Sequence, residues 1–218
     1  MLTTTDAIVL SLQPHSDKAH VLHAYTRAGG RINYRVYGLG RKNAAGKYSP
    51  LSLIQITTDD KSIRTANLSF VPTSLTVDPY KRTIALFMSE VLYHVLKHPM
   101  VDEPMFDFLT NAIQELDRTD EPQNFHLQFL CDFAAKLGFA IPENHTPHTL
   151  HQTPYTIPPT PGTSSRLTGG VASAEKGNLP QTRKARQQAL RALCAYFETH
   201  VETWQTPKSL DVLMEVFD

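Results

Sequence analysis

The amino-acid sequence predicts an α+β protein, in which an N-terminal five-stranded β-barrel is followed by an all-α helical domain. Residues 1–75 hold short segments rich in Val, Ile, Thr, Tyr and Leu, and turn residues separate these segments. From Pro79 onward, apolar residues instead recur at the spacing of amphipathic helices. We therefore expect two domains, covering residues 1–78 and 79–218.

Five segments are expected to form the barrel strands: residues 7–12, 20–26, 31–38, 51–57 and 62–70. Five short strands in so short a span fit a small closed barrel better than an open sheet. The third segment alternates between apolar and polar residues. This alternation places one set on the inner face, Ile32, Tyr34 and Val36, and the other set on the outer face, Arg31, Asn33, Arg35 and Tyr37.

The helical part is punctuated by prolines and one glycine. The first expected helix covers residues 84–95 and stops before Pro99, and Pro104 and Pro122 open the next two. Gly138 is expected just past the end of the third helix. Thr182 is the expected N-cap of a fourth helix, and the apolar residues at 210–217 indicate a short last one. Between them, residues 142–181 form a Pro/Thr-rich loop insert.

Charge is divided unevenly along the chain. Residues 1–82 carry 11 Lys/Arg against 5 Asp, a net charge of +6, and the remaining residues carry −6. A basic barrel suits a polyanion, whereas the acidic helical part is expected to contact proteins. Cys131 and Cys194 lie in apolar helical patterns and are expected as reduced thiols of a cytoplasmic protein. No apolar run approaches the roughly 20 residues that a membrane-spanning helix needs.

The stretch "RVYGLGRKNAAGKYSP" superficially resembles a nucleotide-binding loop. A P-loop needs four residues between its glycine and Gly-Lys, followed by Ser or Thr. Here five residues separate Gly40 from Gly46, and Tyr48 follows Lys47. The dinucleotide pattern fails as well, because Asn43 stands at its third glycine. Neither an ATP site nor a dinucleotide site is expected.

The same stretch can instead serve as a solvated hairpin or as a contact for nucleic-acid phosphates. The second interpretation is favoured because the loop follows a strand with cations and an aromatic ring on its outer face, in a fold that often binds single strands. Lys81 and Arg82 are expected to extend the basic surface. The predicted DNA-binding residues are Arg27, Arg31, Arg35, Tyr37, Gly38, Arg41, Lys42 and Lys47.

No metal, cofactor or catalytic centre is expected. Histidines gather at residues 15–23 and again at His145, His148 and His151, but zinc sites usually add closely spaced cysteines, which this chain lacks. A metal-dependent hydrolase built on the second histidine group is the remaining enzymatic alternative. A nucleophile turn of the G-x-S-x-G kind is absent from the sequence, so we expect a protein without enzymatic activity.

Four segments resemble the bacterial recombination mediator family RecO, in order and at matching spacing. "AIVLSLQPHSDKAHVLHAYTRAGGRINYRVYGLGRKNAAGKYSPL" is similar to the family's N-terminal part, and "SEVLYHVLKHPMVDEPMFDFLTNAIQELD" to its first helical pair. "FHLQFLCDFAAKLGFAIP" is similar to its Leu-Gly-Phe-x-Pro segment, and "LRALCAYFETHVETWQTPKSLDVLMEVF" to its closing helices. The resemblance covers nearly the whole chain.

The resemblance implies an OB-fold barrel that binds single- and double-stranded DNA in the cytoplasm, at the nucleoid. It also implies annealing of complementary strands in the RecF-type pathway of recombinational repair. The implied partners are RecR, the C-terminal tail of single-strand-binding protein and, indirectly, RecA. Many family members carry a four-cysteine zinc site where this chain has "IPENHTPHTLHQ", so no zinc is expected here. The alternative is an RNA-binding OB module in translation or RNA processing.

Overall fold

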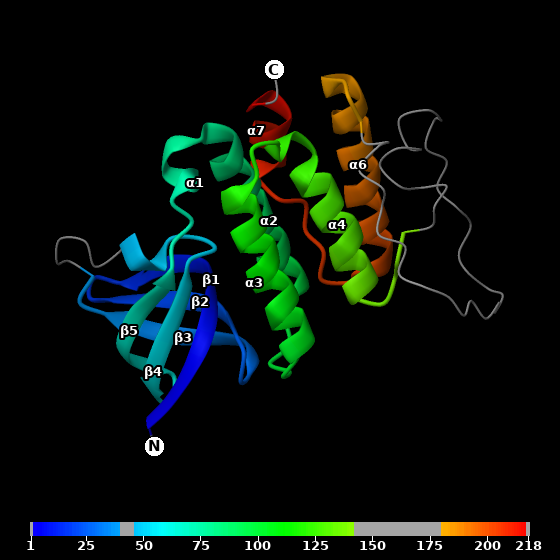
Figure 1. Cartoon of the computed structure of the whole chain (residues 1–218). Helices are drawn as coiled ribbons and strands as arrows, with labels where there is room; N and C mark the ends of the chain where they lie inside the picture. The colour runs from blue at the N-terminus through cyan, green and yellow to red at the C-terminus, as the bar shows by residue number, and fades with distance from the viewer. Residues whose placement is uncertain (1, 40–45, 142–179, 217–218) are drawn as a thin grey trace.

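Five strands close into a barrel in the computed structural model, which describes residues 2–39, 46–141 and 180–216 (Figure 1). Their order around the barrel is β1-β2-β3-β5-β4. The β3 and β5 strands run parallel and every other neighbouring pair runs antiparallel. This closure confirms the predicted five-stranded barrel. The strands are β1 (Leu2–Ser16), β2 (Ala19–Thr26), β3 (Gly30–Tyr37), β4 (Leu53–Asp59) and β5 (Ser62–Phe70).

The first strand is longer than the sequence pattern indicated. It has 15 residues, pairs with β4 through its first half and pairs with β2 through its second half. Pro14 lies within the strand, between the expected strand ranges 7–12 and 20–26. The register to β2 shifts between Pro14 and Ser16, and such an irregularity tolerates a residue that lacks a backbone N–H.

The middle of β1 is buried on both faces. Ala7 and Val9 belong to the core inside the barrel, whereas Ile8 and Leu10 belong to the core shared with the helices. This double burial explains why the sequence reads as a continuous apolar run there. The Ser89 hydroxyl donates to the Leu10 carbonyl at 2.9 Å, which adds a buried hydrogen bond between the helices and this strand.

A short 3-10 helix, η1 (Gly46–Tyr48), lies between β3 and β4 and closes one end of the barrel. Its Tyr48 side chain is buried in the barrel core beside Ile54, Ile56 and Ala66. Burial raises the pKa of the Tyr48 hydroxyl because it disfavours the phenolate.

The second and fourth predicted helices begin at the expected proline and capping residues, whereas the first begins at Pro79, five residues before the expected range of 84–95. Asp78 accepts hydrogen bonds from the backbone N–H groups of Tyr80 and Lys81, and Thr182 accepts one from Ala185. The four-residue α1 was not predicted, since it is too short to show a helical period. The helices are α1 (Ser74–Val77), α2 (Pro79–Val95), α3 (Glu103–Arg118), η2 (Pro122–Asn124), α4 (Phe125–Lys136), α6 (Arg183–His200) and α7 (Ser209–Val216).

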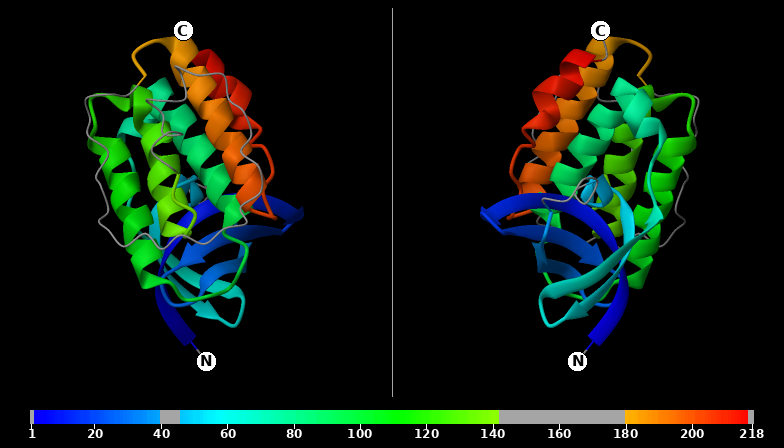
Figure 2. Two further views of the ribbon diagram at one scale, coloured as in Figure 1. Left: turned by 90° about the vertical axis from the view of Figure 1, so that its right-hand side faces the viewer. Right: turned by 90° about the vertical axis from the view of Figure 1, so that its left-hand side faces the viewer.

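The helices pack around α2, which lies with α3 beside the barrel, while α4 and α6 lie on the side away from the barrel (Figures 1 and 2). Stacked rings join α4 to α6, with Phe133 and Phe197 at 6.1 Å between ring centroids. At the other side of α2, the Glu90 carboxylate accepts from the backbone N–H and the hydroxyl of Ser209, at 2.9 and 2.8 Å. These two hydrogen bonds hold the start of α7 against α2. The predicted insert at 142–181 lies almost wholly outside the described residues.

Candidate nucleic-acid interface

The outer face of β3 carries the candidate site, and the predicted alternation holds along the strand. Tyr34 and Val36 point into the barrel and are buried, whereas Arg35 and Tyr37 are exposed. Tyr37 is 57% exposed, which is unusual for a large aromatic residue. Gly38 follows directly, with a positive φ of 74° and open space where a Cβ would stand. An arginine, an aromatic ring and an accessible backbone therefore lie together at the end of this strand.

Two turns flank this end of β3. Tyr37 pairs with Ala19, which follows Lys18 in the β1–β2 turn. On the other side, the backbone N–H of Arg35 donates to the carbonyl of Lys61 in the β4–β5 turn, at 2.7 Å. In the OB-fold, these two loops and the face of strands 2 and 3 are the usual surface for oligonucleotides. Sequence reasoning missed both lysines, since only the strand register brings their turns beside β3.

Acidic residues also occur in these turns. Asp17 precedes Lys18 and Asp60 precedes Lys61, so each turn is close to neutral. Asp59 is paired with Arg64 at 2.8 Å, and that hydrogen bond is the main reason why the pKa of Asp59 is lowered. Among the described residues, the net positive charge at this end therefore comes mainly from Arg35. Arg41 and Lys42 of the β3–β4 loop lie outside the described residues.

Lys47 is held by the barrel itself. Its ammonium donates to the carbonyl of Ala66 at 3.2 Å and lies 5.6 Å from the Tyr48 ring centroid. The side chain is half-buried, so part of its charge stabilises the closed end of the barrel.

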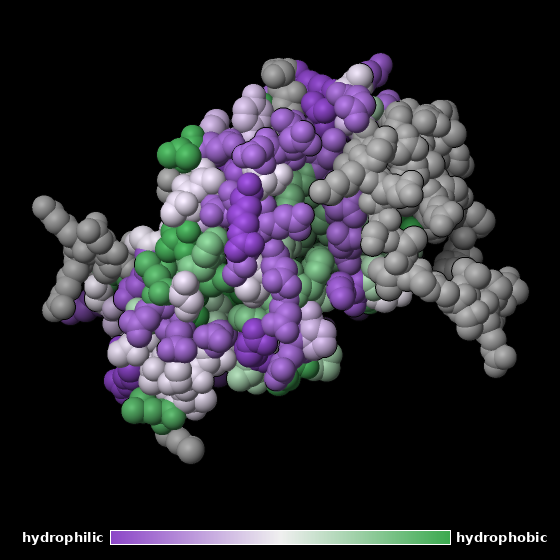
Figure 3. Space-filling model, viewed as in Figure 1, coloured by the Kyte–Doolittle hydropathy of each residue, from purple (hydrophilic) through white to green (hydrophobic). Residues whose placement is uncertain are grey.

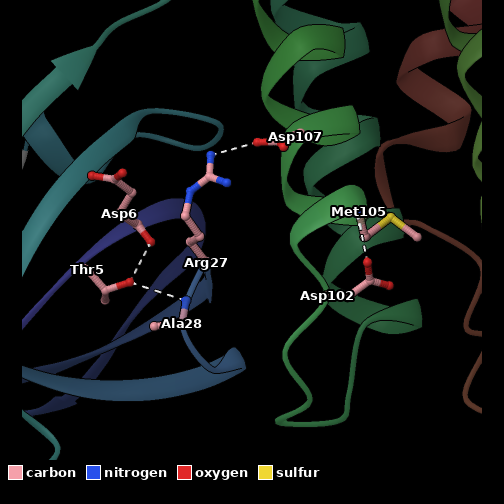
Figure 4. Close-up of polar contacts among 7 residues, drawn as sticks. All are labelled: Thr5, Asp6, Arg27, Ala28, Asp102, Met105 and Asp107. Atoms are coloured by element: carbon pink, nitrogen blue, oxygen red, sulfur yellow. Dashed lines mark hydrogen bonds and ion pairs between the residues drawn. The ribbon is translucent and has the colours of Figure 1, made fainter.

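Arg27 lies at the junction between the barrel and α3 (Figure 4). Its guanidinium donates to the Asp107 carboxylate at 2.7 Å and lies over the Phe106 ring, 4.5 Å from the centroid. The hydrogen bond to Asp107 is the main cause of its raised pKa. Both partners are on α3, so Arg27 connects the barrel with the helices.

Arg31 is on the outer face of β3, as the alternation predicted, but α2 covers it. Only 8% of its surface is exposed, and its guanidinium lies 4.6 Å from the centroid of the Tyr93 ring. Burial lowers the pKa of Arg31, since desolvation disfavours the charged form. Its backbone N–H donates to the carbonyl of His98 at 3.3 Å. Arg31 therefore does not provide an exposed contact surface.

The expected extension of the basic surface through Lys81 is wrong. This lysine is 7% exposed, and its ammonium donates to the carbonyl of Asp117 at the end of α3, at 2.9 Å. Arg82 uses its Nε to hydrogen-bond the carbonyl of Leu75. Both residues hold helix ends together. The hydrophilic surface along α3 is itself largely acidic, with Glu103, Asp107 and Glu115 exposed, and it does not favour DNA (Figure 3).

No group of three or more potential ligands for a metal ion occurs among the described residues. The three spaced histidines at 145, 148 and 151 lie outside them. Within the described part of the chain, no helix is long and apolar enough to cross a membrane.

Comparison with known proteins agrees with this architecture. The family model described as "Recombination protein O C terminal" matches residues 77–150, which begin just before α2. A "DNA repair protein RecO" from Bacteroides fragilis is 30% identical over 249 aligned positions, with both chains covered completely. Proteins with the same description from Porphyromonas gingivalis and Flavobacterium johnsoniae are each 28% identical, again over the full length of both chains. This chain therefore belongs to the RecO family of DNA repair proteins.

Proposed function

We propose that this chain is a non-catalytic mediator of recombinational repair that binds single- and double-stranded DNA at the exposed end of β3. It anneals complementary strands and helps load RecA onto DNA covered by single-strand-binding protein. One observation carries the proposal: Arg35 and Tyr37 lie exposed on the same face of β3, between the two turns that flank this strand. The family's role in DNA repair supports the same conclusion.

The proposed contacts have complementary tasks. Arg35, Lys18 and Lys61 neutralise phosphates, and the loop that contains Arg41 and Lys42 adds further charge. Tyr37 stacks on a base, which is worth about 1–3 kcal/mol per base and tolerates any sequence. Such binding reads no base edges, so it suits a protein that must hold whichever strands are to be paired. Arg27 is left out of this contact set because it is paired with Asp107, and Arg31 is not one of its exposed members because α2 covers it.

The helical part is proposed to contact proteins. For the C-terminal tail of single-strand-binding protein, we propose the small pocket between α4, α6 and α7. Leu190, Leu213 and Met214 give it an apolar lining, and Arg183 and Arg186 lie at its edge. The chemistry of a peptide that ends in an apolar side chain and a carboxylate matches this lining. RecR is proposed as a further protein partner, without a placed contact surface.

The double variant Arg35→Ala/Tyr37→Ala tests the DNA site. Fluorescence anisotropy with a labelled thymidine oligomer of about 16 nucleotides should show a loss of affinity of about fivefold or more, given the stacking contribution of about 1–3 kcal/mol. The loss should be shared by oligomers of mixed sequence, and strand annealing should slow in parallel. The matched control is Arg191→Ala/Tyr80→Ala, which removes the same residue types from exposed positions on α6 and α2.

Equal affinities for the two double variants would contradict the proposed site. A uridine oligomer of about the same length, used as competitor, distinguishes a DNA protein from an RNA-binding module. If RNA displaces the labelled DNA oligomer at a concentration far below that required for unlabelled DNA, the chain is an RNA-binding protein.

A further inference from the structure

A second group of cations surrounds Tyr93 near the end of α2, at the junction with β3. The Arg31 guanidinium lies 4.6 Å from the centroid of the Tyr93 ring, and the Lys97 ammonium lies 4.7 Å from it. His23 and His94 contact the edge or face of the same ring, with centroids 5.0 and 5.2 Å away. Five side chains from β2, β3, α2 and the segment that follows α2 thus meet at one place.

Carboxylates do not neutralise this group. Neither Arg31 nor Lys97 forms an ion pair with a described residue. Glu90 is the acid that acts on His94, but one of its oxygens already accepts two hydrogen bonds from Ser209. The pKa of His94 is lowered, first by burial and then by Lys97 and Arg31, with Lys208 adding to the effect. The local field is therefore positive.

Arg31 is the member of the group whose charge is most costly to bury. Its side chain is more than nine-tenths buried, and its Nη1 has no hydrogen-bond partner among the described residues. A buried cation without a counter-charge is costly, because it has lost water and gained no carboxylate in return. The Tyr93 ring offsets part of this cost through its face. An anion placed beside Lys97 and Lys208 would offset more of it, since Lys97 is half-buried and Lys208 is exposed.

We propose that this junction group, made of His23, Arg31, Tyr93, His94 and Lys97, forms together with the neighbouring Lys208 a phosphate subsite for the DNA strand held by β3. Arg31, Asn33, Arg35 and Tyr37 follow one another on the outer face of the strand, two residues apart. The row leads from the junction group to the exposed end of β3. A strand that stacks on Tyr37 and follows this row reaches Lys97 and Lys208 on the helical side. This inference rests on the proposed DNA site, which it extends across the junction.

The variant Lys97→Gln/Lys208→Gln tests the subsite without disturbing the buried arginine. The control is Lys184→Gln/Arg191→Gln, which removes two exposed charges from α6, on the side of the helices away from the barrel (Figure 1). Affinity is measured at several salt concentrations for thymidine oligomers of about 4 and about 16 nucleotides, which span the usual site sizes of OB folds. Equal thermal midpoints for both variants verify that each is folded.

We expect the junction variant to lose about fivefold or more in affinity for the longer oligomer. Its logarithmic salt slope should become shallower by about 1.4, since each lost phosphate contact contributes about 0.7 for single strands. The shorter oligomer, which the end of β3 holds alone, should bind both variants equally. The control should match the unmodified protein in all of these measurements.

A longer oligomer that binds the junction variant and the control with equal affinity and equal slope would overturn the proposal. A second outcome would also overturn the proposal. If an aspartate hexamer binds the junction variant more weakly while DNA binding is unchanged, the group is a site for an acidic protein segment. The Arg35→Ala/Tyr37→Ala variant separates the two proposals. If it binds normally while the junction variant is weakened, the subsite is supported and the end of β3 is not the main DNA site.

Discussion

Gly30 fixes the position of the barrel relative to the helices, and its replacement by alanine should be severe for the stability of the whole chain. The residue has a φ of +63°, and a Cβ built on it would lie 2.2 Å from the carbonyl oxygen of Met100 and 2.8 Å from its nitrogen. Real Cβ contacts are essentially never shorter than 3.0 Å. Because both obstructing atoms belong to the backbone, the segment after α2 would have to move.

The expected cost has two parts. An alanine in the left-handed region costs about 1–2 kcal/mol. Moving Met100 away also weakens the hydrogen bond that the Arg31 N–H donates to the His98 carbonyl. The loss of such a hydrogen bond costs about 0.5–1.5 kcal/mol. We therefore expect Gly30→Ala to lower the free energy of unfolding by about 1.5–3.5 kcal/mol, against a total of about 5–15 kcal/mol for a typical protein.

Gly38→Ala is the matched control. Gly38 has a φ of +74°, but nothing lies within 4 Å of its added Cβ. Gly38→Ala therefore has the same backbone cost as Gly30→Ala without the collision. The difference between the two losses of unfolding free energy measures the cost of the contact with the Met100 backbone. Urea unfolding, followed by the fluorescence of Trp204 and by circular dichroism, gives both values. Equal losses in the two variants would refute the view that the backbones of Gly30 and Met100 are locked together.

Two further predictions follow from buried titratable groups. Burial lowers the pKa of His126 to about 3, and Arg186 adds to the effect. An unfolded histidine titrates near pH 6.5, so the unfolded state takes up the proton first as the pH falls. The stability that depends on neutral His126 is therefore complete above about pH 6.5 and falls by about 1.4 kcal/mol per pH unit below it. His126→Gln should remove this part of the slope in urea unfolding between about pH 6 and 5, and an unchanged slope would count against it. Burial also raises the pKa of Cys131 and Cys194 to about 12, so iodoacetamide should label them only in unfolded protein; rapid labelling of the native chain at about pH 8 would contradict this.

The elements that the sequence predicts well are those whose signals are local. Proline and capping residues mark the starts of α3 and α6, and side-chain alternation identifies the inner face of β3. The length of β1 was underestimated because Pro14 is normally a turn signal, and only the pairing with β2 shows that the ladder tolerates it. Local rules could not reveal η1 either, since Tyr48 acquires its role from the barrel core that it closes.

The candidate site shows the same division between local and tertiary information. Alternation placed Arg31, Arg35 and Tyr37 on one face of β3, and they do share it. It could not indicate that α2 would cover the first of them and leave the other two exposed. Lys18 and Lys61 were missed for the opposite reason, because only strand register brings their turns beside β3.

The partial cover of β3 has a consequence for how the barrel and the helices act together. An independent barrel would expose the whole outer row of β3, and Arg31 would be an ordinary surface cation. Here Arg27 and Arg31 contact aromatic rings and, for Arg27, a carboxylate on the helices, while the Gly30 backbone touches Met100. The row on β3 is therefore fixed relative to the end of α2. A DNA strand that binds along this row meets a surface whose two halves are already aligned, so no domain closure has to be offset by binding free energy. This rigidity favours a continuous track from the exposed end of β3 to the junction over two sites joined by a hinge.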